Sequence, residues 1–258
     1  MEDKVNICMV TFNRIDFTKN SIESILTHTK YPYTLTDVDN NSHDGTQDYL
    51  KDIYRNGKIK NLILLRENIG VAKASNLAWQ TENFKYYMKY DNDIIFNSGC
   101  WLTPMVELIE NAPDIAIIGY SFEGWNPGVC QINGCDVRVR EGNIGGACVL
   151  IPERTREQIG YWCEDYGLYS EEDYDYCQRV QRIGKRFAYM ANLEIGDHQG
   201  GGDLENDAAY FHWKCAQRRE GLKVLGQNLA KYRKDKNTLY IRSDLNLKDY
   251  EDCFYKGE

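Results

Sequence analysis

The alternation of strand-like and helix-like segments over the first 93 residues constrains the fold of this chain most. Short apolar runs, rich in β-branched and aromatic residues, have the length of buried strands. They are residues 5–11, 34–38, 62–65 and 86–90. The segments between them predict helices over about 16–26 (with Asp16 as N-cap), 47–54 and 71–79. Strands separated by single helices form right-handed βαβ units, so the sequence predicts an α/β fold with a mostly parallel central sheet.

A polar segment follows each of these predicted strands. The segments are Asn13-Arg14, residues 39–46, residues 68–70 and Asp91-Asn92-Asp93. The carboxyl ends of parallel strands meet at one edge of a sheet, and ligands of open α/β sheets bind there. The sequence therefore predicts one binding site to which several loops contribute.

Asp91 and Asp93 stand one residue apart after the fourth predicted strand. Two carboxylates at this spacing can reach one Mg²⁺ or Mn²⁺ ion, which prefers oxygen ligands. A turn rich in Asp and Asn is also common without any metal. The pair alone leaves both interpretations open.

The pattern changes after Asp93. The sequence predicts a helix near 101–111, a hairpin at 129–139 around Asn133-Gly134, a helix from an acidic cluster at 170–175 to about 183, a loop at 196–202, and strands at 115–120, 145–151 and 186–190. From about Ala208 the tendency is helical. We therefore divide the chain into residues 1–202, with a nucleotide-binding half (1–93) and an acceptor half (94–202), and a C-terminal helical extension (203–258).

Composition disfavours several classes of function. The 258 residues carry a formal net charge of −8, which argues against general binding to nucleic acid. No apolar run approaches the roughly 18–20 residues of a transmembrane helix, and residues 1–4 lack a signal-peptide layout. We expect a cytoplasmic protein, with peripheral contact to the inner membrane face left open. Nine scattered cysteines favour the reduced state, although Cys130 and Cys135 flank a turn and a disulfide there is conceivable.

Several motifs follow one another in a specific order. They are Val10-Thr11-Phe12-Asn13-Arg14, residues 39–46, Glu67-Asn68-Ile69-Gly70, Asp91-Asn92-Asp93, Gly145-Gly146, Glu172-Asp173-Tyr174-Asp175 and His198. Together they resemble family-2 glycosyltransferases of the GT-A fold, which is Rossmann-like, over roughly residues 4–200. The similarity is greatest to bacterial and phage enzymes of the rhamnosyl- and galactosyltransferase type.

The resemblance implies a nucleoside diphosphate sugar donor, with a UDP-sugar favoured, and an inverting single displacement. It implies that Mn²⁺ or Mg²⁺ is ligated by Asp93 and His198, with Asp91 on the metal through water or on the ribose. The implied nucleotide-binding residues are Thr11, Asn13, Arg14, Asp39, Asn68, Gly70 and Asp91. The acceptor is left open between a glycan, a lipid-linked sugar and a protein.

A carboxylate must take the proton of the attacking acceptor hydroxyl. By resemblance this base lies in a Glu-Asp pair at the start of a helix, and Glu172-Asp173 fits the pattern. We assign Asp173 as the base, with Glu172 as the second choice, and expect the helix N-terminus to depress the pKa of both. The alternative is that these acids only stabilise the start of the helix, where negative charge is favourable. Trp125, Trp162 and Tyr169 are candidates either for stacking on sugars or for core packing.

Two other functions remain as alternatives. One is a catalytically degenerate GT-A-like module that binds nucleotide or glycan without turnover. The other is a sugar-phosphate nucleotidyltransferase, which is disfavoured because Thr11-Phe12-Asn13-Arg14 lacks the glycines of a phosphate-binding loop. Transfer to modified DNA bases gains no support from the net charge.

Overall fold

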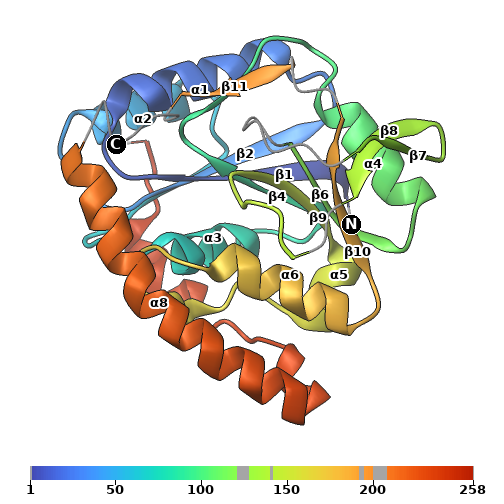
Figure 1. Ribbon diagram of the computed structural model, residues 1–258. Coiled ribbons are helices and arrows are strands. Elements are labelled where there is room, and N and C mark those ends of the chain that lie inside the picture. Colours follow the sequence, from blue (N-terminus) through green and yellow to red (C-terminus); the bar gives the residue numbers. More distant parts are fainter. Residues whose placement is uncertain (1, 121–127, 140–141, 192–194, 200–207, 258) are drawn as a thin grey trace.

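A nine-stranded sheet in the order β3-β2-β1-β4-β9-β6-β10-β8-β7 forms the centre of the molecule (Figure 1). The computed structural model describes residues 2–120, 128–139, 142–191, 195–199 and 208–257. The strands of the sheet are β1 (Glu2–Thr11), β2 (Tyr33–Asp39), β3 (Asn61–Leu64), β4 (Phe84–Asp91), β6 (Ile115–Gly119), β7 (Cys130–Ile132), β8 (Cys135–Val139), β9 (Cys148–Pro152) and β10 (Arg186–Met190).

Strand direction agrees with the predicted mostly parallel sheet. Strands β1, β2, β3 and β4 are mutually parallel, and β10 is parallel to β6. Strand β9 runs antiparallel between β4 and β6, and β8 runs antiparallel to β10. The predicted hairpin around Asn133-Gly134 is confirmed as β7–β8. Cys130 is paired with Val137 in this hairpin, and all nine cysteines are free, so the conceivable disulfide to Cys135 does not form.

The helices cover both faces of the sheet. They are α1 (Ile15–His28), α2 (Thr46–Arg55), α3 (Val71–Gln80), α4 (Leu102–Asn111), α5 (Glu153–Ile159), α6 (Glu172–Arg182) and α8 (Ala208–Lys234), with 3₁₀ turns η1 (Glu164–Tyr166), η2 (Lys236–Leu239) and η3 (Leu247–Cys253). The prediction of Asp16 as N-cap was wrong. The N-cap is Arg14, two residues earlier, with a left-handed backbone (φ 61°), and helix α1 begins at Ile15.

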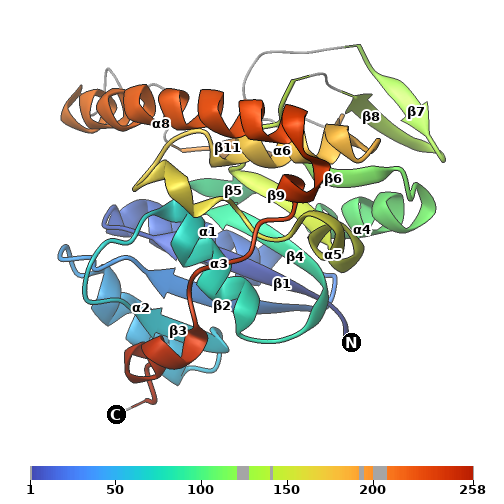
Figure 2. The same cartoon turned by 90° about the horizontal axis from the view of Figure 1, so that it is seen from below.

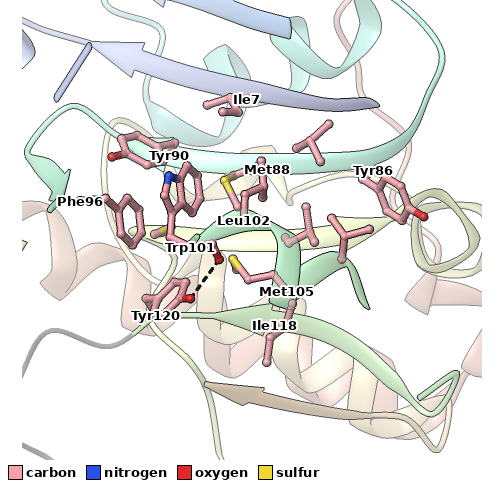
Figure 3. Packing of buried hydrophobic residues seen from close by; sticks show 14 of the residues in the cluster. Ile7, Tyr86, Met88, Tyr90, Phe96, Trp101, Leu102, Met105, Ile118 and Tyr120 are labelled. Carbon is pink, nitrogen blue, oxygen red and sulfur yellow. Dashed lines mark hydrogen bonds between the residues drawn. The ribbon is translucent and has the colours of Figure 1, made fainter. Parts of the chain in front are cut away.

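Alternating side chains of the central strands enter two hydrophobic cores. Ile7 of β1 and Met88 of β4 pack with α1, α2 and α4, whereas Cys8 and Tyr87 pack with α3, α5 and α6. Figure 3 shows the first core, where the rings of Phe96 and Trp101 stack with their centroids 4.1 Å apart. Because helices cover both faces, β4 is buried over most of its length. Its polar carboxyl end lies at the edge of the sheet where the loop begins.

A second, two-stranded sheet joins distant parts of the chain. Strand β5 (Ile94–Phe96) pairs antiparallel with β11 (Gly196–His198), and His198 stands opposite Ile94. Residues 196–198 had been predicted as part of a loop, which is wrong for these three residues. Residues 200–202 of that predicted loop lie outside the described part of the chain, as does Trp125.

Helix α8 runs past α6 on the side of the sheet that carries α3 (Figures 1 and 2). The chain then passes through η2 and η3 and reaches the edge strand β3, where Ile63 and Phe254 form a β-bridge. None of the described helices is both long and apolar enough to cross a membrane.

Candidate active site

The loops after β1, β2 and β4 lie side by side because these strands are adjacent and in register. Thr11 stands opposite Asp39, and Val10 stands opposite Asp91. The predicted convergence of polar loops at one edge of the sheet is therefore what the structure shows.

Hydrogen bonds fix the shape of the first two loops. Asp39 accepts hydrogen bonds from the Ser42 amide (2.9 Å) and the Gln47 side chain (2.7 Å). The Asn13 side chain accepts from the His43 amide (2.8 Å), and the Thr11 hydroxyl lies between two carboxylates, at 2.9 Å from Asp37 and 3.3 Å from Asp39. These contacts give Thr11, Asn13 and Asp39 a role in holding the loops.

A cleft of about 250 Å³ opens beside these loops. Its lining includes Arg14, Asn68, Asp91, Asp93, Glu172, Asp173 and His198, all of which the sequence predicted as site residues. Thr11, Asn13, Asp39 and Gly70 are not among the lining residues, so their contact with a nucleotide stays a prediction. The cleft thus brings the two acidic clusters together from opposite halves of the chain.

Gly70 precedes α3 and packs against the backbone of a neighbouring loop. Its φ is 90°, and a Cβ atom there would stand 2.3 Å from the carbonyl oxygen of Gly167. The amide of Val71, the first residue of the helix, donates to the Leu168 carbonyl oxygen (3.1 Å). Glycine is therefore required by this close approach of two chain segments.

Asp93 is held between two basic side chains. The Arg14 guanidinium is 3.1 Å from Asp93 Oδ2, and His198 Nε2 is 3.2 Å from Asp93 Oδ1. The pairing of β11 with β5 delivers His198 to this position. Burial by itself raises the pKa of Asp93, but His198, Arg14 and Lys214 outweigh it, and the pKa lies below its ordinary value. Asp93 is thus a carboxylate at neutral pH.

The Asp93–His198 pair fits two ligands of one divalent cation. Asp93 Oδ1 is buried, and its 3.2 Å contact with His198 Nε2 does not have the alignment of a regular hydrogen bond. Ligands at neighbouring positions of an octahedral ion, each about 2.1 Å from it, stand about 3 Å apart, close to the 3.2 Å between these atoms. Asp91 does not join the pair, and the described residues contain no group of three metal-binding side chains. A cation here would take its remaining ligands from substrate and water.

Asp91 is turned toward a buried lysine that the sequence analysis did not single out. Lys89 Nζ is 2.5 Å from Asp91 Oδ1 and donates to the Gly146 carbonyl oxygen (2.9 Å). Lys89 and Asp91 are two residues apart in β4 and so project from the same face of the strand. That spacing was a signal in the sequence from which Lys89 could have been found.

The second acidic cluster begins helix α6. Asp173 accepts hydrogen bonds from the amides of Gly146 (3.0 Å) and Tyr174 (2.6 Å), and Glu172 accepts from the Ser170 amide (3.1 Å). Burial, followed by the charge of Asp173, raises the pKa of Glu172 to about 7. Burial likewise raises the pKa of Asp173, although the Gly146 amide and Lys89 oppose this effect. Both pKa values shift upward, opposite to the expectation from the helix N-terminus.

Residues of α8 also line the cleft, although the sequence gave them no role. Tyr210, Trp213 and Lys214 reach it from the first turns of that helix. The Lys214 ammonium is 4.7 Å from the ring centroid of Tyr210 and 5.2 Å from that of Tyr169, which lines the cleft too. Of the other aromatic candidates, Trp162 is a core residue with 1% of its surface exposed.

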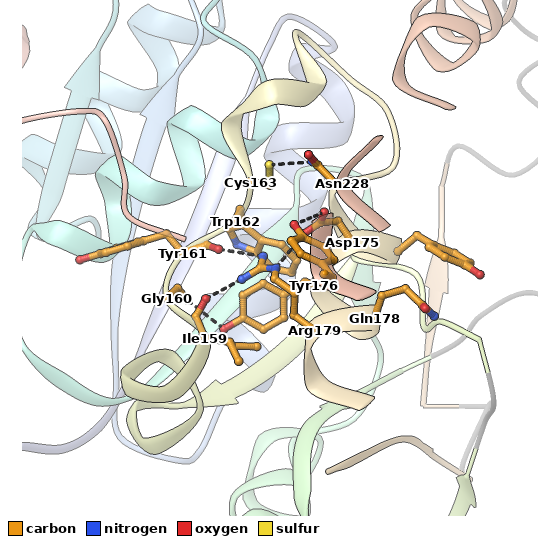
Figure 4. Close-up of polar contacts among 12 residues, drawn as sticks. Ile159, Gly160, Tyr161, Trp162, Cys163, Asp175, Tyr176, Gln178, Arg179 and Asn228 are labelled. Atoms are coloured by element: carbon orange, nitrogen blue, oxygen red, sulfur yellow. Dashed lines mark hydrogen bonds and ion pairs between the residues drawn. The ribbon is translucent and has the colours of Figure 1, made fainter. Parts of the chain in front are cut away.

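Behind the acidic cluster, α6 carries a fully buried ion pair (Figure 4). Arg179 Nε is 2.7 Å from Asp175 Oδ1, and neither side chain is exposed. Asp175 Oδ2 accepts from the hydroxyls of Tyr166 (3.0 Å) and Tyr232 (2.7 Å). Since Tyr232 belongs to α8, this network fixes α8 to the helix that carries Glu172 and Asp173.

The sequence profile of glycosyl transferase family 2 matches residues 6–135, which is half of the chain and includes Arg14, Asp91 and Asp93 of the cleft. The chain belongs to glycosyl transferase family 2. The resemblance inferred from the motifs is thereby confirmed. A comparison with curated protein sequences gave no significant match.

Solved structures with the same fold confirm the predicted GT-A architecture. The mannosyltransferase PcManGT from Pyrobaculum calidifontis, in complex with GDP-Man and Mn²⁺, is 15% identical over 77% of this chain and 57% of its own, with a TM-score of 0.61. TarS 1–349 from S. aureus is 15% identical over 79% and 62%, with a TM-score of 0.58. GalNAc-T7 with UDP, GalNAc and Mn²⁺ is 12% identical over 72% and 41%, with a TM-score of 0.61. The chain spans less than two thirds of each of these proteins.

Proposed function

We propose that this family-2 protein is an inverting, metal-dependent glycosyltransferase that moves a sugar from a nucleoside diphosphate sugar, with a UDP-sugar as first choice, to an acceptor hydroxyl. The observation that carries the proposal is that Asp93 and His198, 3.2 Å apart, line the same cleft as the Glu172-Asp173 pair. One side of the cleft suits a metal-bound diphosphate and the other a general base. A cytoplasmic location and a glycan, lipid-linked or protein acceptor stay predictions.

Donor binding is assigned to the β1, β4 and β11 side of the cleft. Asp93 and His198 would hold Mn²⁺ or Mg²⁺, and the bound ion would offset the negative charge of the departing diphosphate. Arg14 and Lys214 line the same cleft and add positive charge within an acidic protein. Asp91 would contact the ribose, or the metal through water. Two of the similar structures contain Mn²⁺ with a nucleotide or nucleotide sugar, which supports testing this ion first.

Transfer is assigned to the α6 side of the cleft. The acceptor oxygen forms a bond to the anomeric carbon, while the bond from that carbon to the β-phosphate oxygen breaks. The acceptor proton passes to Asp173, and the nucleoside diphosphate leaves. A single displacement inverts the anomeric configuration and requires no covalent nucleophile.

Thermal unfolding with UDP, GDP, dTDP or CDP, each with and without Mn²⁺, tests donor binding. A ligand present at 100 times its Kd adds about 2.7 kcal/mol of stability, which such a scan detects. We expect one nucleotide to stabilise the protein in the presence of metal, and Asp93→Asn to abolish that effect. Asp48→Asn changes an exposed acid on α2 and serves as the control.

Asp173→Asn separates binding from chemistry. This variant is expected to keep the metal-dependent stabilisation by nucleotide and to lose release of nucleoside diphosphate from the matching donor sugar. NMR of the first product formed by the wild type should show inversion at the anomeric carbon. Nucleotide binding without any turnover in the wild type would support the degenerate module, and no binding of any nucleotide would refute the proposed function.

A further inference from the structure

Lys89 is a buried cation between the two halves of the cleft. It lies in the middle of the central sheet, on β4, with 3% of its surface exposed. Burial favours the neutral amine and lowers the pKa of Lys89, but the charges of Asp91 and Glu172 outweigh this effect, and the pKa lies above its ordinary value. A buried charge of this kind is costly unless it is paired and hydrogen-bonded, so its place among these acids calls for a functional explanation.

The ammonium connects Asp91 to Asp173 through the backbone of one residue, Gly146. Lys89 Nζ contacts Asp91 and donates to the carbonyl oxygen of Gly146. The amide of the same Gly146 donates to Asp173 Oδ2 (3.0 Å). A larger residue at this position would crowd Asp173, because a Cβ on Gly146 would stand 3.1 Å from Asp173 Cβ, whereas its 3.5 Å distance to Lys89 Nζ is an ordinary contact. The three side chains are therefore fixed relative to one another.

Lys89 also affects the ionisation of Glu172 and Asp173 through its charge. The groups that interact electrostatically with Glu172 or Asp173 are Lys89 from β4, Tyr169 and Glu171 from the segment before α6, and Arg218 from α8. Arg218 forms an ion pair with Glu171, so much of its charge is offset by that neighbour. Lys89 is the cation on the strand side of the pair, and it favours the ionised form that a general base requires.

We propose that Lys89 is a positioning residue for glycosyl transfer, which holds Asp91 on the donor side and, through Gly146, Asp173 on the acceptor side. This inference rests on the proposed function. Lys89 neither takes nor gives a proton in the reaction. It fixes the distance between the donor and the base, and its charge keeps the base ionised.

The test compares Lys89→Met, Lys89→Arg and the control Lys85→Met. Methionine fills much of the space without the charge, whereas arginine keeps the charge. Lys85 lies on the same strand, in a surface ion pair with Glu110 (2.8 Å). We expect Lys89→Met to keep metal-dependent nucleotide binding within about threefold and to lower kcat up to about 100-fold, as misplacement of a reacting group does. Lys89→Arg should recover part of kcat, and Lys85→Met should behave as the wild type.

The pH dependence distinguishes positioning of the base from a general loss of structure. Loss of a nearby cation raises a carboxylate pKa by about one unit, so the acid limb of kcat/KM in Lys89→Met should move to higher pH by that amount. A carboxyl ¹³C NMR titration of Lys89→Met without substrate should show that the pKa of Glu172 rises by the same amount. If Lys89→Met does not fold, Gly146→Ala gives a second test, since its Cβ would stand 3.1 Å from Asp173 Cβ and should displace that side chain by a few tenths of an ångström.

The outcomes separate the two proposals. A wild type that binds nucleotide with Mn²⁺ and transfers sugar, together with a Lys89→Met variant of unchanged kcat and unchanged pH profile, would overturn the role of Lys89 alone. A Lys89→Met variant with a lower kcat, but with the wild-type pH profile of kcat/KM and the wild-type pKa of Glu172, would also overturn it. A wild type that binds no nucleotide refutes the proposed function before Lys89 is tested.

Discussion

The buried network around Asp175 gives a quantitative prediction about the docking of α8. Two tyrosines donate to the same oxygen, Asp175 Oδ2, while Oδ1 is paired with Arg179. In Tyr232→Phe or Tyr166→Phe, this oxygen keeps the other hydroxyl as a donor. In the double variant it loses both. The structure therefore predicts that the two substitutions are not additive.

The magnitudes follow from the charge of the acceptor. A hydrogen bond to a charged group contributes about 1.5–3 kcal/mol, and we place each single variant near the low end because one donor remains. The double variant leaves a buried carboxylate oxygen without either hydroxyl. It should lose about 1 kcal/mol more than the sum of the single variants, which is within the range of coupling for residues in contact.

Urea unfolding followed by tryptophan fluorescence measures these differences, because Trp79, Trp101 and Trp162 are all buried in the cores. Tyr240→Phe is the control, since that side chain is 45% exposed. Each single variant should also lower Tm by roughly 3–6 °C, at about 2–4 °C per kcal/mol for a chain of this size. Strictly additive losses, or single losses below about 0.5 kcal/mol, would refute the reasoning that both hydroxyls stabilise one buried charge.

Two further substitutions test individual residues of the site. Gly70→Ala places a Cβ 2.3 Å from the Gly167 carbonyl oxygen at a φ of 90°. Urea unfolding should show a loss of stability at least about 1 kcal/mol larger than for Gly57→Ala, because Gly57 also has a positive φ but open space around it. Equal losses of stability would show that the close approach is unimportant. Burial and the charge of Asp173 raise the pKa of Glu172 to about 7, so Glu172 is charged only above that pH. Glu172→Gln removes this charge. Asp173 ionises while Glu172 is still neutral, because the charge of Asp173 is one of the causes that raise the pKa of Glu172. The pKa of Asp173 and the acid limb of kcat/KM should therefore stay close to their wild-type positions. Loss of transfer at every pH would instead identify Glu172 as the base.

Most of the sheet could be predicted because its signal is local. The runs at 86–90 and 115–120 are apolar apart from Lys89, and each is a strand in the structure within a few residues of the predicted bounds. Strand β11 could not be predicted, since Gly196-Asp197-His198 has no strand pattern and is extended only because it pairs with β5. Without that pairing, the position of His198 beside Asp93 could not be derived from spacing.

The site was predicted best where residues project from strand ends or a helix start. Asp93 and Asp173 lie in one cleft as expected. Lys89 could not be placed beside Asp173 from the sequence, because Gly146, which connects them, comes from a distant part of the chain. The contribution of α8 was missed for another reason: Tyr210, Trp213 and Lys214 share one helix face at i, i+3 and i+4, but the sequence does not show what that face contacts.

The return of the chain from η3 to β3 has a consequence for how the protein forms during synthesis. The Tyr255 amide donates to the Leu62 carbonyl oxygen (2.9 Å), and Phe254 forms a bridge with Ile63, so residues almost two hundred positions apart meet at the edge of the sheet. Unpaired edges of this kind are where incomplete chains associate. While the polypeptide is still on the ribosome, the family-2 segment can assemble its parallel strands, but this edge stays open until the last of these contacts is made. Synthesis of residues 254 and 255, rather than completion of the family-2 segment, therefore sets the earliest moment at which this edge is covered.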